Sequence, residues 1–245
     1  MLTGLITDIH EDLVSLKKII TALEKAGCTE LICMGDIVGY AKPFYHYEET
    51  RNADECVEII RKNCVNTVLG NHDLYHIGRL TEFKAGIIYP QDWFTMETSK
   101  KSRLFADKLW IYDDDFPVKL SSDNIEFLKS CPEFAIYQDR FFISHYLFPD
   151  LSGSLKKFVN NPFSAWKHFR FIKKYGCHTG ICGHVHPNGF QYIRKLNSSF
   201  RVFSEIKISG KTQQFCVPPV ASGKNNSGYA ILDKKNSTIT SFKLK

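Results

Sequence analysis

The chain has 245 residues, of which 43% are hydrophobic and 24% charged, and its formal net charge is +6. These proportions are typical of a globular protein and exclude a disordered, collagen-like or coiled-coil chain. No apolar run approaches the ~20 residues of a membrane-spanning helix, and the first residues do not resemble a signal peptide. The length favours one domain over two, so we predict a single domain over residues 1–245.

The eight cysteines are too few for a fold held together by disulfides, and no Cys-x-x-Cys pair marks a zinc ribbon or a redox site. Most of them lie in apolar runs, where a cysteine acts as a small hydrophobic side chain. We therefore expect a cytoplasmic protein. The mild positive charge suits an anionic substrate but does not identify one.

The first 73 residues alternate between short apolar runs and helical periodicity. Runs at 2–7, 30–34 and 66–69 predict buried strands, and each run ends in polar residues. Apolar residues at helical spacing predict helices at 13–23 and 56–64. This order implies parallel βαβ units, in which the ligand site lies beyond the carboxyl ends of the strands.

Residues 74–120 are less regular, and we expect helices and loops that form a lid or an insertion beside the site. An ordinary core explains their aromatic residues equally well; these are Trp93, Phe94, Phe105 and Trp110. We interpret the three consecutive aspartates at 113–115 as a solvated loop rather than a cation site.

The remaining chain again alternates between apolar runs and polar ends. A short helix is predicted around 125–128, a hairpin at 134–137 and 141–144, a helix from 161 to 172 and a strand at 177–182. Runs at 190–193, 201–208, 229–232 and 238–244 predict antiparallel strands.

Five clusters of metal-ligating residue types lie at or just after predicted strand ends: Asp8-Ile9-His10, Gly35-Asp36, Asn71-His72-Asp73, His145 and His184-Val185-His186. Each cluster alone is more often structural, but their joint occurrence in an α/β pattern indicates a metal site. Imidazole, carboxylate and amide groups suit Mn, Fe, Zn, Co or Ni, and we favour Mn. Seven such ligands are too many for one ion, whereas two divalent ions bridged by one carboxylate use them all.

The order D-x-H, G-D, G-N-H-D, H and G-H-x-H resembles that of the calcineurin-like metallophosphoesterases. All five motifs occur in family order across residues 8–186, and the GDIVGY segment at 35–40 resembles a compact bacterial and archaeal branch of that superfamily. The resemblance implies an α/β fold, a four-layer α-β-β-α sandwich in which two mixed β-sheets face each other with helices outside.

The resemblance also implies a role for each residue. The first metal would be held by Asp8, His10 and His186, the second by Asn71, His145 and His184, with Asp36 bridging the two. His72 would protonate the leaving oxygen as a general acid, and Asp73 would orient His72. A hydroxide between the metals would attack phosphorus, and Asn71 would help to stabilise the developing charge.

These roles predict a metal-dependent hydrolase of a small phosphodiester or phosphomonoester, which includes nucleotides. Tyr146 stands where related proteins carry a glycine, and residues 218–223 depart from the late motif of the branch, so substrate preference does not carry over. A protein phosphatase is disfavoured because residues 38–40 read Val-Gly-Tyr and contain no phosphate-clamping arginine.

Two alternatives remain open. A nuclease would need a basic groove, and the lysine pairs at 100–101, 156–157 and 173–174 are candidates for it, which we interpret as solvated surface. Nucleic acid is therefore a possible but not a favoured partner, and a membrane is not expected. A non-catalytic scaffold with this fold would have lost part of the motif, whereas here every position is filled.

Overall fold

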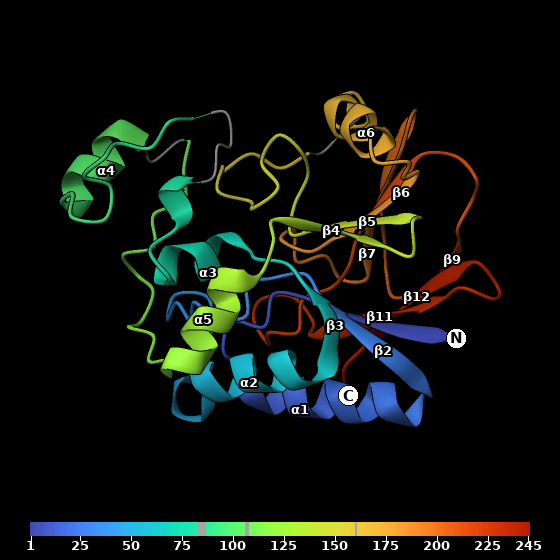
Figure 1. The fold of residues 1–245 in the computed structure, drawn as a ribbon, viewed down its shortest axis with the longest axis horizontal. Coiled ribbons are helices and arrows are strands. Elements are labelled where there is room, and N and C mark those ends of the chain that lie inside the picture. Colours follow the sequence, from blue (N-terminus) through green and yellow to red (C-terminus); the bar gives the residue numbers. More distant parts are fainter. Residues whose placement is uncertain (83–86, 106–107, 160) are drawn as a thin grey trace.

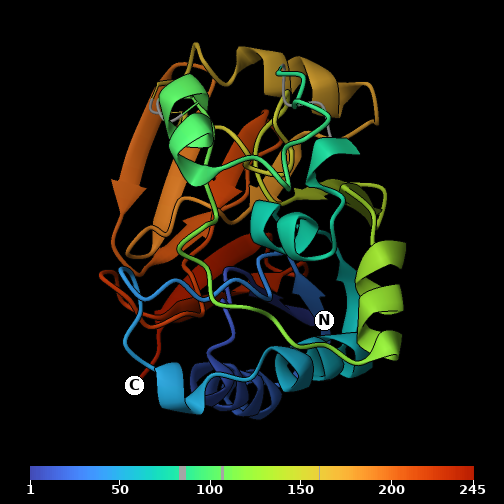
Figure 2. The ribbon, with the colours of Figure 1, turned by 90° about the vertical axis from the view of Figure 1, so that its left-hand side faces the viewer.

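Two six-stranded mixed β-sheets face each other, and helices cover their outer faces (Figures 1 and 2). The computed structural model describes residues 1–82, 87–105, 108–159 and 161–245. The four-layer α-β-β-α sandwich predicted from the sequence is confirmed. None of the described helices is long and apolar enough to cross a membrane.

The first sheet combines a parallel half from the start of the chain with an antiparallel half from its end. Its order is β3-β2-β1-β11-β12-β9, with bounds β1 Leu2–Ile6, β2 Cys28–Cys33, β3 Cys64–Thr67, β9 Glu205–Lys207, β11 Gly228–Asp233 and β12 Thr238–Lys243. Strands β1, β2 and β3 are parallel. Helices α1 (Leu13–Lys25) and α2 (Ala53–Asn63) cover its outer face, at the bottom of Figure 1.

Local sequence explains where these helices begin. The Asp12 carboxylate accepts a hydrogen bond from the Ser15 backbone N–H at 2.9 Å, and the Asn52 side chain accepts one from Glu55 at 3.0 Å. Both residues are therefore N-caps, which satisfy backbone donors that the first helical turn leaves unpaired.

The second sheet has the order β4-β5-β6-β10-β7-β8. Its strands are β4 Phe134–Tyr137, β5 Phe141–Ser144, β6 Thr179–Cys182, β7 Phe190–Arg194, β8 Asn197–Arg201 and β10 Gln213–Cys216. Strands β5, β6 and β10 are parallel to one another. Helix α6 (Trp166–Lys173) covers the outer face, at the top of Figure 1, and buries Phe169 and Ile172 against the sheet.

Strand alternation builds three hydrophobic layers. In β1, Leu5 belongs to the core between the sheets, together with Ile143 and Ile181 of the second sheet. The next residue, Ile6, points the other way and packs with Leu16 below the first sheet. Successive strand residues alternate between faces, so one short apolar strand serves two cores.

The predicted elements are confirmed with shifts at their ends, the largest at α6, which begins at Trp166 and not at residue 161, and with two further corrections. Strand β10 was not predicted, because its glutamines Gln213 and Gln214 are fully buried polar residues that interrupt the apolar pattern. The run at 201–208 is not one strand: β8 ends at Arg201 in the second sheet and β9 begins at Glu205 in the first.

The segment 74–120 contains the end of α3 (Asn71–His76), the short helix η2 (Leu80–Glu82) and α4 (Thr98–Phe105). A further short helix, η1, spans Glu48–Thr50, and α5 spans Ser122–Ser130. Trp93 is buried and packs on Tyr89, as the core interpretation expects, whereas Phe94 is 39% exposed and does not fit that interpretation. Residues 83–86 and 106–107 of this segment lie outside the described residues.

Candidate metal centre

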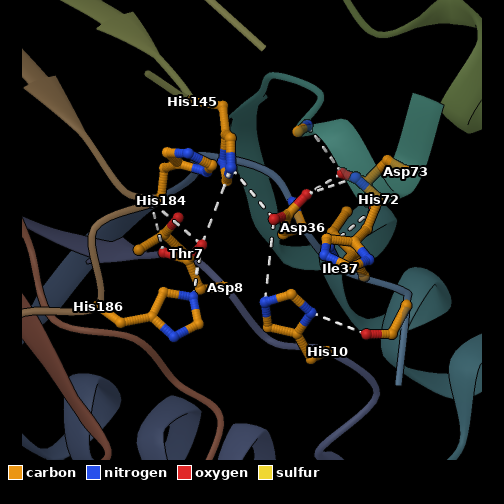
Figure 3. Close-up of polar contacts among 12 residues, drawn as sticks. Thr7, Asp8, His10, Asp36, Ile37, His72, Asp73, His145, His184 and His186 are labelled. Carbon is orange, nitrogen blue, oxygen red and sulfur yellow. Dashed lines mark hydrogen bonds and ion pairs between the residues drawn. The ribbon is translucent and has the colours of Figure 1, made fainter. Parts of the chain in front are cut away.

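The loops that follow β1, β2, β3, β5 and β6 converge at one edge of the sandwich. They bring together every residue that the sequence placed in the metal site, and Figure 3 shows most of these side chains facing one another. Parallel strands end at the same edge of a sheet, which is why clusters up to 178 residues apart meet there.

Asp8, His10 and His186 form the first group of potential ligands, with one donor atom of each within 4.8 Å of the others. The Nε2 atom of His186 lies 3.1 Å from Oδ1 of Asp8. The backbone N–H of His184 donates to both oxygens of Asp8, at 3.1 and 2.9 Å, and so fixes the orientation of this carboxylate.

Asp36, His145 and His184 form the second group under the same distance limit. The Oδ2 atom of Asp36 lies 3.2 Å from Nε2 of His145 and 3.9 Å from Nε2 of His10. Asp36 therefore stands between the two groups, while its Oδ1 accepts the His72 backbone N–H at 2.9 Å.

The buried donor atoms fit divalent metal ions. Within the described part of the chain, four of them lack a hydrogen-bond partner: Nε2 of His10, His145 and His184, and Oδ1 of Asn71. Nδ1 of His10 donates to the Gly39 carbonyl at 2.9 Å, and Nδ1 of His145 donates to the Met34 carbonyl at 2.6 Å. These carbonyl groups favour the tautomer whose Nε2 lone pair faces the site, a common arrangement for metal-binding histidines.

Backbone strain is concentrated at the ligands. Among the described residues, nine that are not glycine have a positive φ, and five of these are Asp8, His10, Asp36, His184 and His186, at 46–66°. Each such conformation costs on the order of 1 kcal/mol and persists where the surrounding structure enforces it. The loops thus hold ligand geometry at the expense of local stability.

Burial and neighbouring charges shift the pKa values of the ligands. Burial, with the positive charge of neighbouring histidines, lowers the pKa of His10 to about 4 and that of His184 to about 3. Burial opposes protonation of His145 too, but Asp36 outweighs it and raises the pKa of His145 to about 10. A metal ion binding at His145 must therefore displace a proton.

A family model described as calcineurin-like phosphoesterase matches residues 1–188. The chain belongs to this family. Its members are phosphoester hydrolases that use divalent metal ions, and they include phosphodiesterases and phosphatases. The resemblance drawn from the five motifs is thus confirmed.

Individual relatives of this chain are distant. The uncharacterized protein MJ0912 of Methanocaldococcus jannaschii is 27% identical over 183 residues, which cover 69% of this chain and 63% of the relative. The matched region thus spans less than two thirds of that relative. A metallophosphoesterase from Sphaerobacter thermophilus (21% identity, TM-score 0.68) and protein PH1004 of Pyrococcus horikoshii (11%, 0.58) share the fold, and each match covers all of this chain and 88% of the other.

The structure differs from the sequence prediction in which carboxylate contacts the His72 ring. Asp73 was expected to do so, but its carboxylate instead accepts backbone N–H groups of Asp36, Ile37 and Val38 at 2.8–3.1 Å, and that of Gly70 at 3.0 Å. These bonds tie the loop after β2 to the start of α3. The expected role of Asp73 is therefore wrong, and the residue fixes the loop that carries Asp36.

Asp115 takes the position expected of Asp73. Its Oδ2 lies 2.6 Å from Nδ1 of His72 and 3.1 Å from Nε2 of His76, and its side chain is 3% exposed. The interpretation of residues 113–115 as a solvated loop is thus wrong for Asp115. The signal was the acidic run itself, which also supplies the Asp113 carboxylate paired at 2.9 Å with the buried Lys101.

Glu11 and Arg51 are further residues that the sequence did not single out. The buried Glu11 carboxylate accepts the backbone N–H groups of Gly39 and Tyr40 at 3.1 and 3.2 Å, and it pairs with Arg51 at 2.5 Å. Gly39 itself has φ +93°, and a Cβ there would collide with the His72 ring. Glu11 therefore helps to hold the loop over which His72 packs.

The site opens into a cleft of about 270 Å³. Four residues of the two ligand groups line one part of the cleft together with His72: His10, Asp36, His184 and His186. Aromatic side chains form much of the remaining lining: Phe44, Tyr45, Trp110, Tyr112 and Phe158. The segment 110–115 thus supplies a wall of the cleft, while its role as a lid stays a prediction. Lys224, Asp114 and Asp115 add charge to the lining.

Proposed function

We propose that the protein hydrolyses a small phosphodiester or phosphomonoester with two divalent metal ions, Mn being favoured. The observation that carries the proposal is the pair of potential ligand groups that meet at Asp36, with four buried donor atoms that lack a hydrogen-bond partner among the described residues. When bound, two such ions stabilise charge on a phosphoryl group and lower the pKa of a water molecule. Asp8, His10 and His186 would hold one ion; Asn71, His145 and His184 the other.

His72 is the proposed general acid. Its Nδ1 contacts Asp115, so Nε2 is the atom that can deliver a proton to the leaving oxygen. Burial opposes protonation of this ring, but the charges of Asp115 and Asp36 outweigh it and raise the pKa of His72 to about 9. The side chain is thus protonated at neutral pH, as an acid must be before the reaction.

The cleft supports a small substrate over a polymer. Its volume of about 270 Å³ is close to the lower limit of small-molecule sites. The Asp114 and Asp115 carboxylates in its lining would repel the successive phosphates of a long nucleic acid. The aromatic side chains of the lining offer an apolar surface to the organic part of an ester.

All eight cysteines are free, which supports our proposal that the protein acts in the reducing cytoplasm.

One panel tests the proposal. The purified protein is loaded with Mn, Ni, Zn, Fe or Mg, its metal content is measured, and hydrolysis of p-nitrophenyl phosphate and bis-(p-nitrophenyl) phosphate is followed. We expect two ions per chain and turnover that His184→Ala abolishes. His178→Ala, which removes an exposed histidine at the opposite end of β6, is the matched control and should behave like wild type. Weak metal binding without hydrolysis would instead support a scaffold.

A further inference from the structure

A second groove, of about 700 Å³, lies between α6 and the turn that joins β7 to β8. We call it the basic groove, because five cationic side chains line it: Lys173, Arg194, Lys195, Arg201 and Lys211. His178, which also lines it, precedes the amino end of β6, whereas the metal ligand His184 follows the carboxyl end. The basic groove is thus separated from the metal centre by the length of that strand. Helix α6 lies on the far side of the sandwich from α1 and α2 (Figures 1 and 2).

The charge of the chain is distributed unevenly around this groove. Between Leu151 and Ser204, 54 consecutive residues contain nine Lys and Arg and no Asp or Glu. The whole chain has 32 basic and 26 acidic residues, so the part outside this segment carries a net charge of −3. The modest overall charge of +6 therefore conceals a strongly basic region that includes α6, β7 and β8.

The five cations of the basic groove are free of carboxylate partners. None of them forms an ion pair with an acidic side chain in the described part of the chain, and no Asp or Glu lines the groove. Lys101 shows the contrast, because it is buried and paired with Asp113. Unpaired cations around one concavity add their fields and attract a polyanion.

An exposed aromatic side chain stands beside these cations. Trp166, at the start of α6, lines the groove with 47% of its surface exposed, and Nζ of Lys195 lies 5.7 Å from the centre of its ring. Burial of a tryptophan side chain usually stabilises a folded protein. A tryptophan that stays exposed therefore offers a flat aromatic surface to a ligand. Proteins that bind single-stranded nucleic acid place cations along its phosphate backbone and aromatic rings where its bases can stack.

We propose that the basic groove binds a single strand of nucleic acid, with phosphates against the five cations and a base stacked on Trp166. The inference does not depend on the proposed hydrolysis, because it concerns side chains outside the metal centre. A concave groove suits a strand, whereas a flat lipid surface would meet only its rim. The lysine at 173, which the sequence alone assigns to solvated surface, becomes part of a binding site.

The test measures fluorescence anisotropy of a labelled 12-nucleotide single strand with the metal-free protein, which avoids cleavage. For five phosphate contacts, the logarithm of the affinity should fall with the logarithm of salt concentration with a slope of about −3.5. The double variant Lys195→Glu/Lys211→Glu should bind at least about tenfold more weakly. Trp166→Ala should weaken binding about fivefold or more, and Trp166→Phe should restore most of it.

The matched control is Lys18→Glu/Lys25→Glu, which changes net charge equally on exposed positions of α1. It should bind the strand like wild type, and both double variants should retain hydrolysis of the generic esters. Equal loss in the two double variants would overturn the inference, since it would show attraction by net charge alone. Tighter binding to vesicles rich in anionic lipid, or to a poly-glutamate peptide, than to the strand would overturn it as well.

Discussion

Oδ2 of Asp115 lies 2.6 Å from Nδ1 of His72, although the two residues are 43 positions apart. Burial works against ionisation of Asp115, but the His72 charge and its hydrogen bond outweigh burial and hold the pKa of Asp115 below its usual range. The pair therefore consists of a carboxylate and a protonated ring near neutral pH. In the proposed mechanism, Asp115 acts on the reaction only through His72, which would make it a positioning residue.

Asp115→Asn should change the pH profile rather than abolish activity. Without the carboxylate, the pKa of His72 falls from about 9 towards its ordinary value of 6.5, so the proton is lost at lower pH. We expect the alkaline limb of the kcat profile to move to lower pH by one unit or more, on the order of tenfold less activity at pH 9. Asp114→Asn removes the same charge from the exposed neighbour and should leave the limb in place.

His72→Ala tests the general acid directly. We expect kcat to fall by about 10²–10⁴ for an ester with a poor leaving group, with metal content unchanged. The same variant should lose much less with a p-nitrophenyl ester, because nitrophenolate leaves without a proton. An equal loss for both leaving groups would assign His72 to binding or to metal retention instead.

Asp36→Asn should affect both metal positions at once, because Asp36 Oδ2 lies between His145 and His10. Loss of an outer-shell partner already costs about 10–100-fold in metal affinity, so loss of this shared ligand should cost more than about 100-fold. Elemental analysis should find fewer than one ion per chain in Asp36→Asn but about one in His184→Ala. Retention of two ions in Asp36→Asn would remove the bridging role.

The predicted clusters of potential ligands meet in space because each follows an apolar strand, and parallel strands end at one edge. Asp115 was missed for a physical reason: it follows no strand, and an acidic run is usually solvated. Strand β10 was missed because a buried strand can carry polar residues when they find partners. Gln213 donates to Thr179 Oγ1 at 3.2 Å and to the Ser209 carbonyl at 2.8 Å, which no periodicity reveals.

The contacts of Asp73 show a second limit of prediction from the sequence. The motif places a carboxylate next to His72, and adjacency suggests that the two interact. In the structure Asp73 lies in the first turn of α3 and points back to the β2 loop, where it satisfies backbone donors of both segments. Neighbouring residues in a helix point in different directions, so adjacency in sequence is poor evidence of contact.

Gly39→Ala should impair catalysis. The residue has φ +93°, and an added Cβ would meet the His72 ring. Both the strained backbone and the collision would displace His72, so we expect kcat at saturating metal to fall by about 10-fold or more. Gly78→Ala is the matched control, because Gly78 also has a positive φ, of +74°, but open space around it.

His168, which the sequence left without a role, should make the fold sensitive to acid. The ring is fully buried, its Nδ1 accepts the Phe148 backbone N–H at 3.0 Å, and its Nε2 donates to Gln214 Oε1 at 2.8 Å. Only the neutral ring satisfies both bonds. Burial accordingly lowers the pKa of His168 to about 4, whereas the unfolded chain has an ordinary value of 6.5.

Between pH 6.5 and 4 the unfolded chain therefore takes up a proton at His168 that the folded chain refuses, so stability falls as the pH falls through this range. Lowering the pH from 7.5 to 5 should therefore reduce the unfolding free energy of wild type by about 2 kcal/mol through His168. His168→Gln has no ring to titrate at this position, so its stability does not fall with pH for this reason. The difference in unfolding free energy between wild type and His168→Gln, measured by urea titration, should therefore be about 2 kcal/mol smaller at pH 5 than at pH 7.5. A constant difference for His168→Gln would mean that the folded protein protonates His168 as readily as the unfolded chain does.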